Sequence, residues 1–269
     1  MAKKILITGA SSGIGKATAL YFATQGWEVI ATMRNPQNAG ELADNDRITV
    51  LQLDVTNQAE IDAVVKDATA SGKVDVVLNN AGFGSVGPLE GTSTEQLQQI
   101  INTNLIGVIQ LTKAFLPHFR KNKGGVFIAI SSIGGLVSYP FFSLYHATKW
   151  AIEGWTESMA FELKPLGIKI KTVQPGATKS EFVGRSLVMP EHEAYDKFFD
   201  GFKSLFFSDE VINSMDEPES VAKVVYEAAT DGKDQLRYLV GPAVVAEFNK
   251  RLTLGAEEFH NQTAKIFLS

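Results

Sequence analysis

The sequence predicts an α/β fold in which helices cover both faces of a doubly wound parallel sheet. Two observations predict it. β-prone apolar runs alternate with segments of helical periodicity along most of the 269 residues, and a glycine-rich turn joins the first such strand to the first helix. This alternation implies crossover connections and parallel pairing. We find no linker, repeat or low-complexity tract, so we expect a single domain over residues 1–269.

The expected elements follow from the apolar pattern, in order along the chain. Residues 5–7 form the first strand, apolar residues at helical spacing from Ala17 to Ala23 form the first helix, and the run 27–31 completes a βαβ unit. Residues 180–215 interrupt the alternation with a phenylalanine-rich segment, a candidate flap over an apolar substrate. The remaining elements are strands at 48–55, 74–82, 125–132, 168–176 and 236–241, and helices at about 59–70, 94–120, 145–163 and 218–230.

Composition excludes several classes of function. The net charge of −5, with no block of basic residues to offset it, argues against nucleic acid and anionic membrane surfaces. Cysteine is absent, which excludes disulfides, thiolate zinc sites and cysteine nucleophiles, and the four histidines lack ligand spacing, so no metal is expected. No apolar run reaches the ~18 residues of a membrane span and the N-terminus lacks a signal-peptide pattern, so we expect a cytoplasmic protein.

The glycine-rich turn TGASSGIG, residues 8–15, lies where a sheet of this type binds phosphate groups at a helix N-terminus. Its three glycines would provide a tight turn, close approach of the backbone to a pyrophosphate and close helix packing. A P-loop is the main nucleotide-binding alternative, but its motif needs glycine at Ala10 and serine or threonine at Ala17. The pattern therefore favours a dinucleotide; the structural alternative is a loop that only needs positive φ.

The end of the second strand indicates which dinucleotide. An acidic residue there binds ribose hydroxyls of NAD, whereas a basic residue accommodates the 2′-phosphate of NADP. No carboxylate stands between Glu28 and Glu41, and Arg34 could form a charge-assisted contact with phosphate. We therefore expect NADP(H) to be preferred over NAD(H). The alternative is that Arg34 is only an exposed arginine after a strand.

The stretch YHATK, residues 145–149, places Tyr145 and Lys149 one turn apart on one face of a helix. A neighbouring ammonium can lower the pKa of a phenol and prepare it for proton transfer. One such pair could also arise by chance among six tyrosines. His146 lies about 100° further round the helix, so we expect it to point away from the target of Tyr145.

Six motifs in sequence order give the chain its resemblance to the short-chain dehydrogenases/reductases, a family with a Rossmann-like fold. The resemblance covers residues 3–241 and implies a hydride-transfer enzyme. The segment after PG departs from the family pattern, with Thr178 where an aliphatic residue is common and Ser180 where threonine is common. The motifs are TGASSGIG at 8–15, LDV at 53–55, NNAG at 79–82, Asn104 in TNLIG, Ser132 thirteen residues before the YxxxK pair of Tyr145 and Lys149, and PG at 175–176.

The resemblance implies a role for each matching residue. Tyr145 would pass a proton to or from the substrate oxygen, its pKa lowered by Lys149 and oxidised nicotinamide, and Ser132 would stabilise that oxygen. Lys149 would also bind the nicotinamide ribose, and Asn104 would hold a water in a proton path. The residues expected to contact the cofactor are Gly9, Ser11, Ser12, Gly13, Ile14, Gly15, Arg34, Asp54, Val55, Asn80, Ala81, Gly82, Tyr145, Lys149, Pro175, Gly176, Thr178 and Ser180.

The expected function is an NADPH-dependent oxidoreductase that transfers hydride between nicotinamide and a carbonyl or secondary alcohol, with a small apolar molecule as substrate. Two alternatives stay open: an NADP-binding sensor without turnover, and a nucleotide-sugar epimerase or dehydratase on the same fold. In the family, helices matching 94–120 and 145–163 pair between subunits, so a homodimer or homotetramer is expected. The candidates for substrate contact are Phe83, Val137, Tyr139, Phe141, Phe142 and Phe182.

Overall fold

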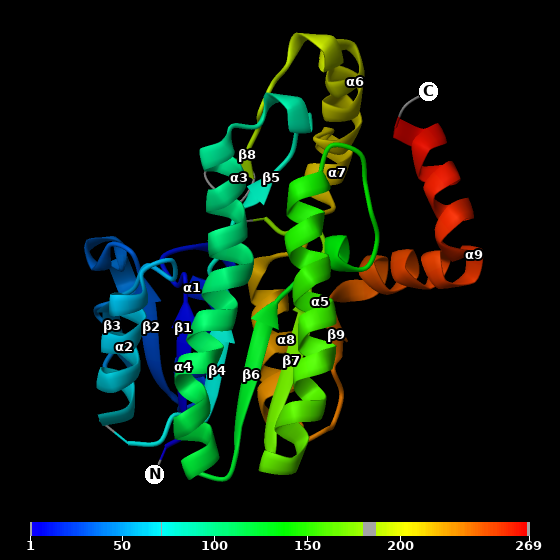
Figure 1. Cartoon of the computed structure of the whole chain (residues 1–269). Helices are drawn as coiled ribbons and strands as arrows, with labels where there is room; N and C mark the ends of the chain where they lie inside the picture. Colours follow the sequence, from blue (N-terminus) through cyan, green and yellow to red (C-terminus); the bar gives the residue numbers. More distant parts are fainter. Residues whose placement is uncertain (1, 71, 180–186, 268–269) are drawn as a thin grey trace.

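The computed structural model describes residues 2–70, 72–179 and 187–267. Within these ranges the main sheet has seven strands, all parallel, in the order β3–β2–β1–β4–β6–β7–β9 (Figure 1). The predicted doubly wound sheet is confirmed. Its order reverses between β1 and β4, and ligands bind at such a switch point in open α/β sheets. The strands are β1 (Lys4–Thr8), β2 (Glu28–Met33), β3 (Ile48–Gln52), β4 (Val76–Asn79), β6 (Gly125–Ile130), β7 (Ile168–Gln174) and β9 (Arg237–Leu239).

Two helical layers enclose the sheet, because its strands carry apolar side chains on both faces. Within β1, Ile5 and Ile7 pack with α1 and α8, whereas Leu6 packs on the opposite side with α2, α4 and α5. Figure 1 shows α4 and α5 in front of the strands and α8 behind them. The helices of the two layers are α1 (Gly13–Thr24) and α8 (Pro218–Thr230) on one face, and α2 (Gln58–Ala70), α4 (Gly107–Lys121) and α5 (Ser143–Leu163) on the other.

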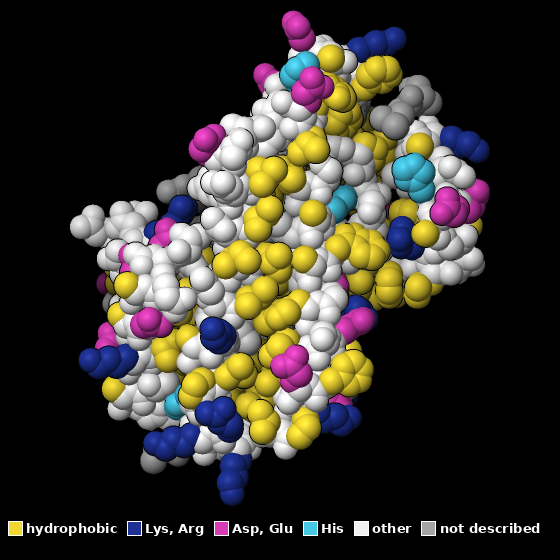
Figure 2. All heavy atoms as spheres, viewed as in Figure 1, with side chains coloured by type: hydrophobic (Ala, Val, Ile, Leu, Met, Phe, Trp, Pro, Cys, Tyr) yellow, Lys and Arg dark blue, Asp and Glu magenta, His cyan; other side chains and the backbone are white. Residues whose placement is uncertain are grey.

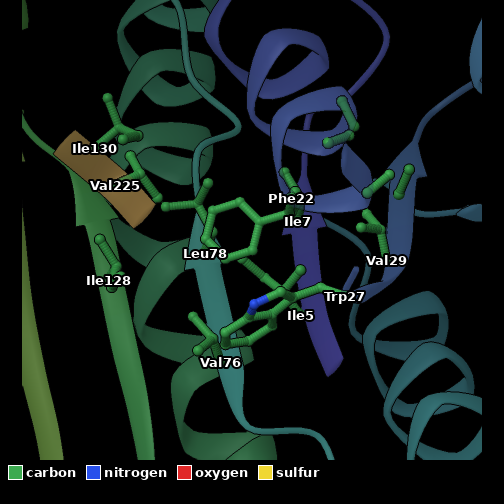
Figure 3. Packing of buried hydrophobic residues seen from close by; sticks show 14 of the residues in the cluster. Ile5, Ile7, Phe22, Trp27, Val29, Val76, Leu78, Ile128, Ile130 and Val225 are labelled. Atoms are coloured by element: carbon green, nitrogen blue, oxygen red, sulfur yellow. The ribbon is translucent and has the colours of Figure 1, made fainter. Parts of the chain in front are cut away.

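The core on the α1 side centres on two aromatic rings. Phe22 of α1 meets Trp27 edge to face, with ring centroids 5.1 Å apart, and both residues are buried. Figure 3 shows these rings over the apolar side chains of β1 and β4, with Val225 of α8 beside them. Burial of one such side chain contributes about 1.5 to 3 kcal/mol. This packing fixes α1, and therefore the glycine turn before it, against the sheet.

The helix expected over residues 94–120 is not regular throughout. α3 (Thr94–Ile101) passes into a π-helical turn, η4 (Asn102–Ile106), before α4 begins at Gly107. A π turn inserts an extra residue into the helical hydrogen-bond pattern and is common at functional sites. Here the turn contains Asn104, which is 2% exposed. The short 3₁₀ helices elsewhere are η1 (Pro36–Asn38), η2 (Gly40–Leu42), η3 (Leu89–Gly91), η5 (Ile133–Gly135), η6 (Lys164–Leu166) and η7 (Glu193–Tyr195).

A smaller structure lies beyond the carboxyl ends of the main strands (Figure 1). There β5 (Gly84–Ser85) pairs in parallel with β8 (Leu187–Val188), and α6 (Asp196–Phe206) and α7 (Asp209–Asn213) follow. Of these elements, β8, α6 and α7 lie within the segment 180–215 that the sequence marks as a candidate flap. The chain closes with α9 (Gly241–Phe267), which the sequence patterns above do not assign and which bends at Gly255, where φ is 76°.

A buried ion pair joins β7 to the loop after α8. Lys171 of β7 is 2% exposed, and its ammonium donates hydrogen bonds of 2.8 Å each to Ala228 O, Asp231 Oδ1 and the Tyr238 hydroxyl oxygen. The Tyr238 hydroxyl in turn donates to Asp231 Oδ2 over 2.6 Å. All three donors of the ammonium therefore have acceptors, which a buried lysine requires.

The described residues lack the features of two other classes of site, a membrane span and a metal centre. None of their helices combines the length and apolar character needed to cross a bilayer. Among the same residues, no group of three or more His, Cys, Asp or Glu side chains is arranged to hold a metal ion.

Candidate active site

One cavity of about 490 Å³ lies at the carboxyl ends of the main strands. Residues from the β1–α1 turn, from the segments after β2, β3, β4, β6 and β7, and from α5 line it. Of the predicted site residues, Gly15 and Asn104 lie behind this wall, and Ser180 lies outside the described residues. Those that line the cavity are Gly9, Ser11, Ser12, Gly13, Ile14, Arg34, Asp54, Val55, Asn80, Ala81, Gly82, Ser132, Tyr145, Lys149, Pro175, Gly176 and Thr178.

The glycine turn at one end of the cavity has room for a pyrophosphate and no room for further side chains. Gly9 has φ 66°, and a Cβ on it would lie 2.8 Å from Ala81 Cα. A Cβ on Gly15 would lie 2.4 Å from Gly9 O. Ser12, at the N-cap of α1, makes no side-chain capping hydrogen bond, so the first N–H groups of α1 are available to an anion. The residues present therefore fit a dinucleotide.

Asn80 fastens this turn to the end of β4. Its Nδ2 donates to Thr8 O over 2.8 Å and to Gly9 O over 3.0 Å. The hydroxyl of Thr8 accepts from the backbone N–H of Asn80 at 2.9 Å and of Ala81 at 3.0 Å. Asn80 therefore holds the glycine turn in place through hydrogen bonds, a role that the sequence motif alone does not specify.

The cavity wall next to the glycine turn is formed by residues at the ends of β2 and β3. Met33 is buried, whereas Arg34 is exposed and borders the cavity. Asp54 Oδ1 accepts from the backbone N–H of Thr56 at 2.9 Å and from its hydroxyl at 2.7 Å. Arg34 thus supplies positive charge at the rim, while Asp54 is held by its own loop.

Tyr145 and Lys149 lie in the first two turns of α5 and both face the cavity. The Lys149 ammonium donates to Ile130 O over 2.8 Å and lies 5.6 Å from the centre of the Tyr145 ring. Burial lowers the pKa of Lys149 to about 8, and the nearby Glu153 carboxylate opposes this change. One helical turn therefore brings an amine of reduced basicity beside the phenol.

The pKa of Tyr145 differs from the sequence-based expectation. Burial raises it to about 12, and a hydrogen bond with Ser132 only partly opposes that effect. Lys149, with oxidised nicotinamide, was expected to lower this pKa, but in the chain by itself burial of the phenol is the dominant effect. At neutral pH Tyr145 is therefore protonated, which is the state of a proton donor.

Ser132 is the N-cap of η5 and lies two residues after the end of β6. Its Oγ accepts from the backbone N–H of Gly134 over 3.0 Å, which fixes the side chain at the cavity wall. Ser131, the preceding residue, also borders the cavity, but it is 2% exposed and its Oγ is fully enclosed. The serine thirteen residues before Tyr145 is therefore the one that reaches Tyr145.

Asn104 supports the cavity from behind. Its Nδ2 donates to Phe83 O over 2.8 Å and to Thr148 Oγ1 over 3.3 Å, and its Oδ1 accepts from the Phe83 N–H at 3.0 Å. Thr148 Oγ1 donates to Tyr145 O over 2.8 Å. The π turn thus connects the loop after β4 to the helix that carries the Tyr–Lys pair.

The other end of the cavity is aromatic, and sequence reasoning located only part of it. Of the six candidates for substrate contact, Phe83, Tyr139 and Phe142 line the cavity, Val137 and Phe141 do not, and Phe182 lies outside the described residues. Phe206 of α6 and the adjacent Phe207 complete this end. His146 also lines it, although its helical position predicted that it would point away.

The fold and this cavity define a nucleotide-dependent oxidoreductase of the doubly wound class. The model of the short chain dehydrogenase family matches residues 3–188, and the chain belongs to that family. It is 34% identical to 3-ketodihydrosphingosine reductase of Bacteroides thetaiotaomicron over 98% of this chain and 97% of the relative. A short-chain dehydrogenase structure from Streptomyces avermitilis is 35% identical, with TM-score 0.83, and covers 94% of this chain and 92% of its own.

Similar solved structures differ in the cofactor they hold. The structure described as ElxO with NADP bound is 30% identical, with TM-score 0.77, over 91% of this chain and 100% of its own. The 3-ketoacyl-(acyl-carrier-protein) reductase of Brucella melitensis, 27% identical with TM-score 0.74, is complexed with NADH and covers 88% of this chain and 96% of its own. The family therefore implies a nicotinamide cofactor, but it does not distinguish NADP, which carries a 2′-phosphate, from NAD, which does not.

Proposed function

We propose that this protein is an NADPH-dependent reductase, or the reverse dehydrogenase, of an apolar ketone, aldehyde or secondary alcohol. The observation that carries the proposal is that Tyr145, Ser132 and Lys149 meet at the wall of the same cavity as the glycine turn. A phenol, a hydroxyl and an amine around one point are the groups that a carbonyl reduction requires.

In the direction of reduction, bound NADPH supplies a hydride from nicotinamide C4 to the carbonyl carbon. Ser132 donates a hydrogen bond to the carbonyl oxygen, which becomes negatively charged. Tyr145 gives its proton to the same oxygen; its raised pKa of about 12 keeps that proton in place at neutral pH until the reaction. Lys149 stabilises the phenolate that remains, and Asn104 holds the start of α5 in register.

The Tyr145→Phe variant tests the reaction, because it removes only the hydroxyl. We expect kcat for NADPH oxidation on a panel of ketones to fall by at least about 100-fold, while NADPH binding measured by fluorescence stays within about threefold. Tyr226→Phe, on α8 in the opposite helical layer, is the matched control and should keep its activity. A fully active Tyr145→Phe variant would contradict the proposed reaction.

The preference for NADP rests on Arg34, which borders the cavity at the end of β2 and is exposed. A charge-assisted contact to the 2′-phosphate contributes about 1.5 to 3 kcal/mol, or about tenfold to a few hundredfold in kcat/KM. Met33→Asp with Arg34→Leu should invert the preference, because it offers a carboxylate to the ribose hydroxyls instead. Arg120→Leu, an exposed arginine on α4, is the control. A wild-type preference for NAD would contradict this assignment.

An apolar substrate is supported by the aromatic end of the cavity and by the likeness to the relative named 3-ketodihydrosphingosine reductase. The alternatives make different predictions. A sensor would bind NADPH and reduce no carbonyl compound in a broad panel. An epimerase or dehydratase would keep its cofactor through purification and cycle it without net oxidation. Net NADPH consumption that depends on Tyr145 excludes both.

A homo-oligomer is proposed from the surface over α4 and α5. Figure 2 shows hydrophobic side chains gathered in a band on this face. Trp150 and Phe161 of α5 are 40% and 80% exposed, and Ile106 before α4 is 37% exposed. A second copy of the chain would cover such a band. Sedimentation should give a dimer or tetramer for the wild type and smaller species for Phe161→Glu; a monomeric wild type would contradict it.

A further inference from the structure

The imidazole of His146 is a polar group that has no role in the proposed reaction. His146 is 7% exposed, and its ring stacks on Phe142 with centroids 5.4 Å apart and 19° between the planes. Its ring centre lies 6.1 Å from that of Tyr139 and 6.2 Å from that of Tyr145. All four residues line the cavity. The imidazole therefore lies between the reacting phenol and the aromatic end of the cavity.

Both imidazole nitrogens are available to a ligand. Within the described part of the chain neither nitrogen makes a hydrogen bond, and burial is the cause that lowers the pKa of His146 to about 4. Neither nitrogen is among the fully enclosed, unpaired side-chain atoms of the described residues, and His146 lines the cavity. At neutral pH the ring is neutral, with one N–H donor and one acceptor. A buried polar group of this kind needs a partner.

Tyr139 adds a second group with a defined direction. Its hydroxyl donates to Glu247 Oε1 of α9 over 3.4 Å, so its oxygen can only accept from the cavity side. Burial and then the Glu247 carboxylate raise the pKa of Tyr139, which keeps the hydroxyl protonated. The neutral imidazole of His146 thus offers one donor and one acceptor to a ligand, and the hydroxyl oxygen of Tyr139 offers a second acceptor. A hydroxyl or amino group meets this combination, because each can both donate and accept.

We propose that His146, with Tyr139, determines specificity by hydrogen-bonding a hydroxyl or amino group that the substrate carries within a few bonds of its carbonyl. The substrate class is then a hydroxy ketone or amino ketone with an apolar chain, rather than a plain ketone. This inference rests on the proposed function, because it identifies the substrate of the same site. Phe142 and Phe206, whose ring centroids are 5.0 Å apart, both line the cavity and would form an apolar wall against the chain.

The test compares two ketones that differ by one group: a long-chain ketone and the same ketone with a hydroxyl on the carbon next to the carbonyl. Dissociation constants for the enzyme loaded with NADP⁺ are measured by calorimetry, and kcat/KM with NADPH is measured in parallel. The wild type should favour the hydroxy ketone by about 10- to 100-fold, the range of one or two hydrogen bonds in a buried site.

The variants separate recognition from structural support. His146→Phe keeps the stacked ring and removes both nitrogens, so the hydroxy ketone should lose about 10- to 100-fold relative to the plain ketone. His146→Gln restores a donor and an acceptor and should recover part of the ratio. Tyr139→Phe should lower it as well. His260→Phe, on the exposed side of α9, should leave it unchanged.

The outcomes distinguish this inference from the proposed function. If neither ketone consumes NADPH but the binding ratio depends on His146, the proposed reaction fails and the recognition site stands. If the wild type binds both ketones equally, or if His146→Phe keeps the wild-type ratio in binding and in kcat/KM, the inference is overturned whether or not the protein is a reductase.

Discussion

Removal of the Asp231 carboxylate is expected to destabilise the protein strongly, because it leaves the buried Lys171 ammonium without a counter-ion. Burial raises the pKa of Asp231, but hydrogen bonds from Lys171 and Tyr238 outweigh it and lower the pKa from 3.8 to about 2. That difference corresponds to about 2 kcal/mol of stability at neutral pH. Truncating one partner of a buried pair costs more, about 3 to 5 kcal/mol, since the other charge stays buried.

The assay is urea unfolding of Asp231→Asn, followed by circular dichroism at pH 7. The matched control is Asp234→Asn in the same loop: Asp234 pairs with Lys164 over 2.8 Å, but the two side chains are 70% and 73% exposed. An exposed pair of this kind contributes little to stability, because solvent screens the two charges. A double variant that also carries Lys171→Met should regain much of the loss, because no unpaired charge remains.

The same ion pair has a pH signature with a defined sign. The folded pKa of Asp231 lies below the unfolded value, so its contribution is present above about pH 4 and is lost as pH falls towards 2. Asp231→Asn should therefore lose less stability than the wild type over this interval. Unfolding midpoints of Asp231→Asn and Asp234→Asn that agree within the error of the measurement would refute the reasoning.

Three further predictions concern the site. Gly15→Ala places a Cβ 2.4 Å from Gly9 O and should weaken NADPH binding by at least about tenfold in a fluorescence titration, whereas Gly154→Ala in open space should leave it unchanged. A small amine-reactive reagent should modify Lys149 with a pH midpoint near 8. Glu153→Gln should lower that midpoint, because it removes the carboxylate that raises the pKa of Lys149. The folded pKa of His146, about 4, lies below the usual 6.5, so stability should fall by about 3 kcal/mol between pH 6.5 and 4; His146→Phe should flatten this fall, and an unchanged slope would count against it.

Much of the sheet could be predicted from the sequence because its strands are buried on both faces and read as apolar runs. The long helix at 94–120 was predicted as one regular element, and the structure shows the π turn around Asn104 instead. Helical periodicity cannot reveal that turn, since one inserted residue changes the apolar pattern very little. What selects it is tertiary: Asn104 bonds to Phe83 O and Thr148 Oγ1.

The site motifs predicted which residues meet, but not their surroundings. His146 was expected to face away from the target of Tyr145 because adjacent helical positions differ by about 100°. The cavity wall curves round the start of α5, however, and a Cβ on Gly134 would lie 2.9 Å from the His146 ring. The 3₁₀ helix η5 therefore extends the cavity wall to the side of α5 on which His146 lies. The raised pKa of Tyr145 was missed for a related reason, because sequence spacing gives the distance to Lys149 but not the burial.

The pairing of β1 has a consequence for how the chain folds. Ile5 pairs with Val29 on one side and with Val76 on the other, and among the described residues every pairing in the main sheet is parallel, so none is made through a hairpin. Loop closure must therefore precede every strand pairing, which makes folding slow compared with helical bundles. During synthesis, β1 lacks its inner neighbour until residue 76 has left the ribosome, so an apolar strand edge stays open to other chains for that interval.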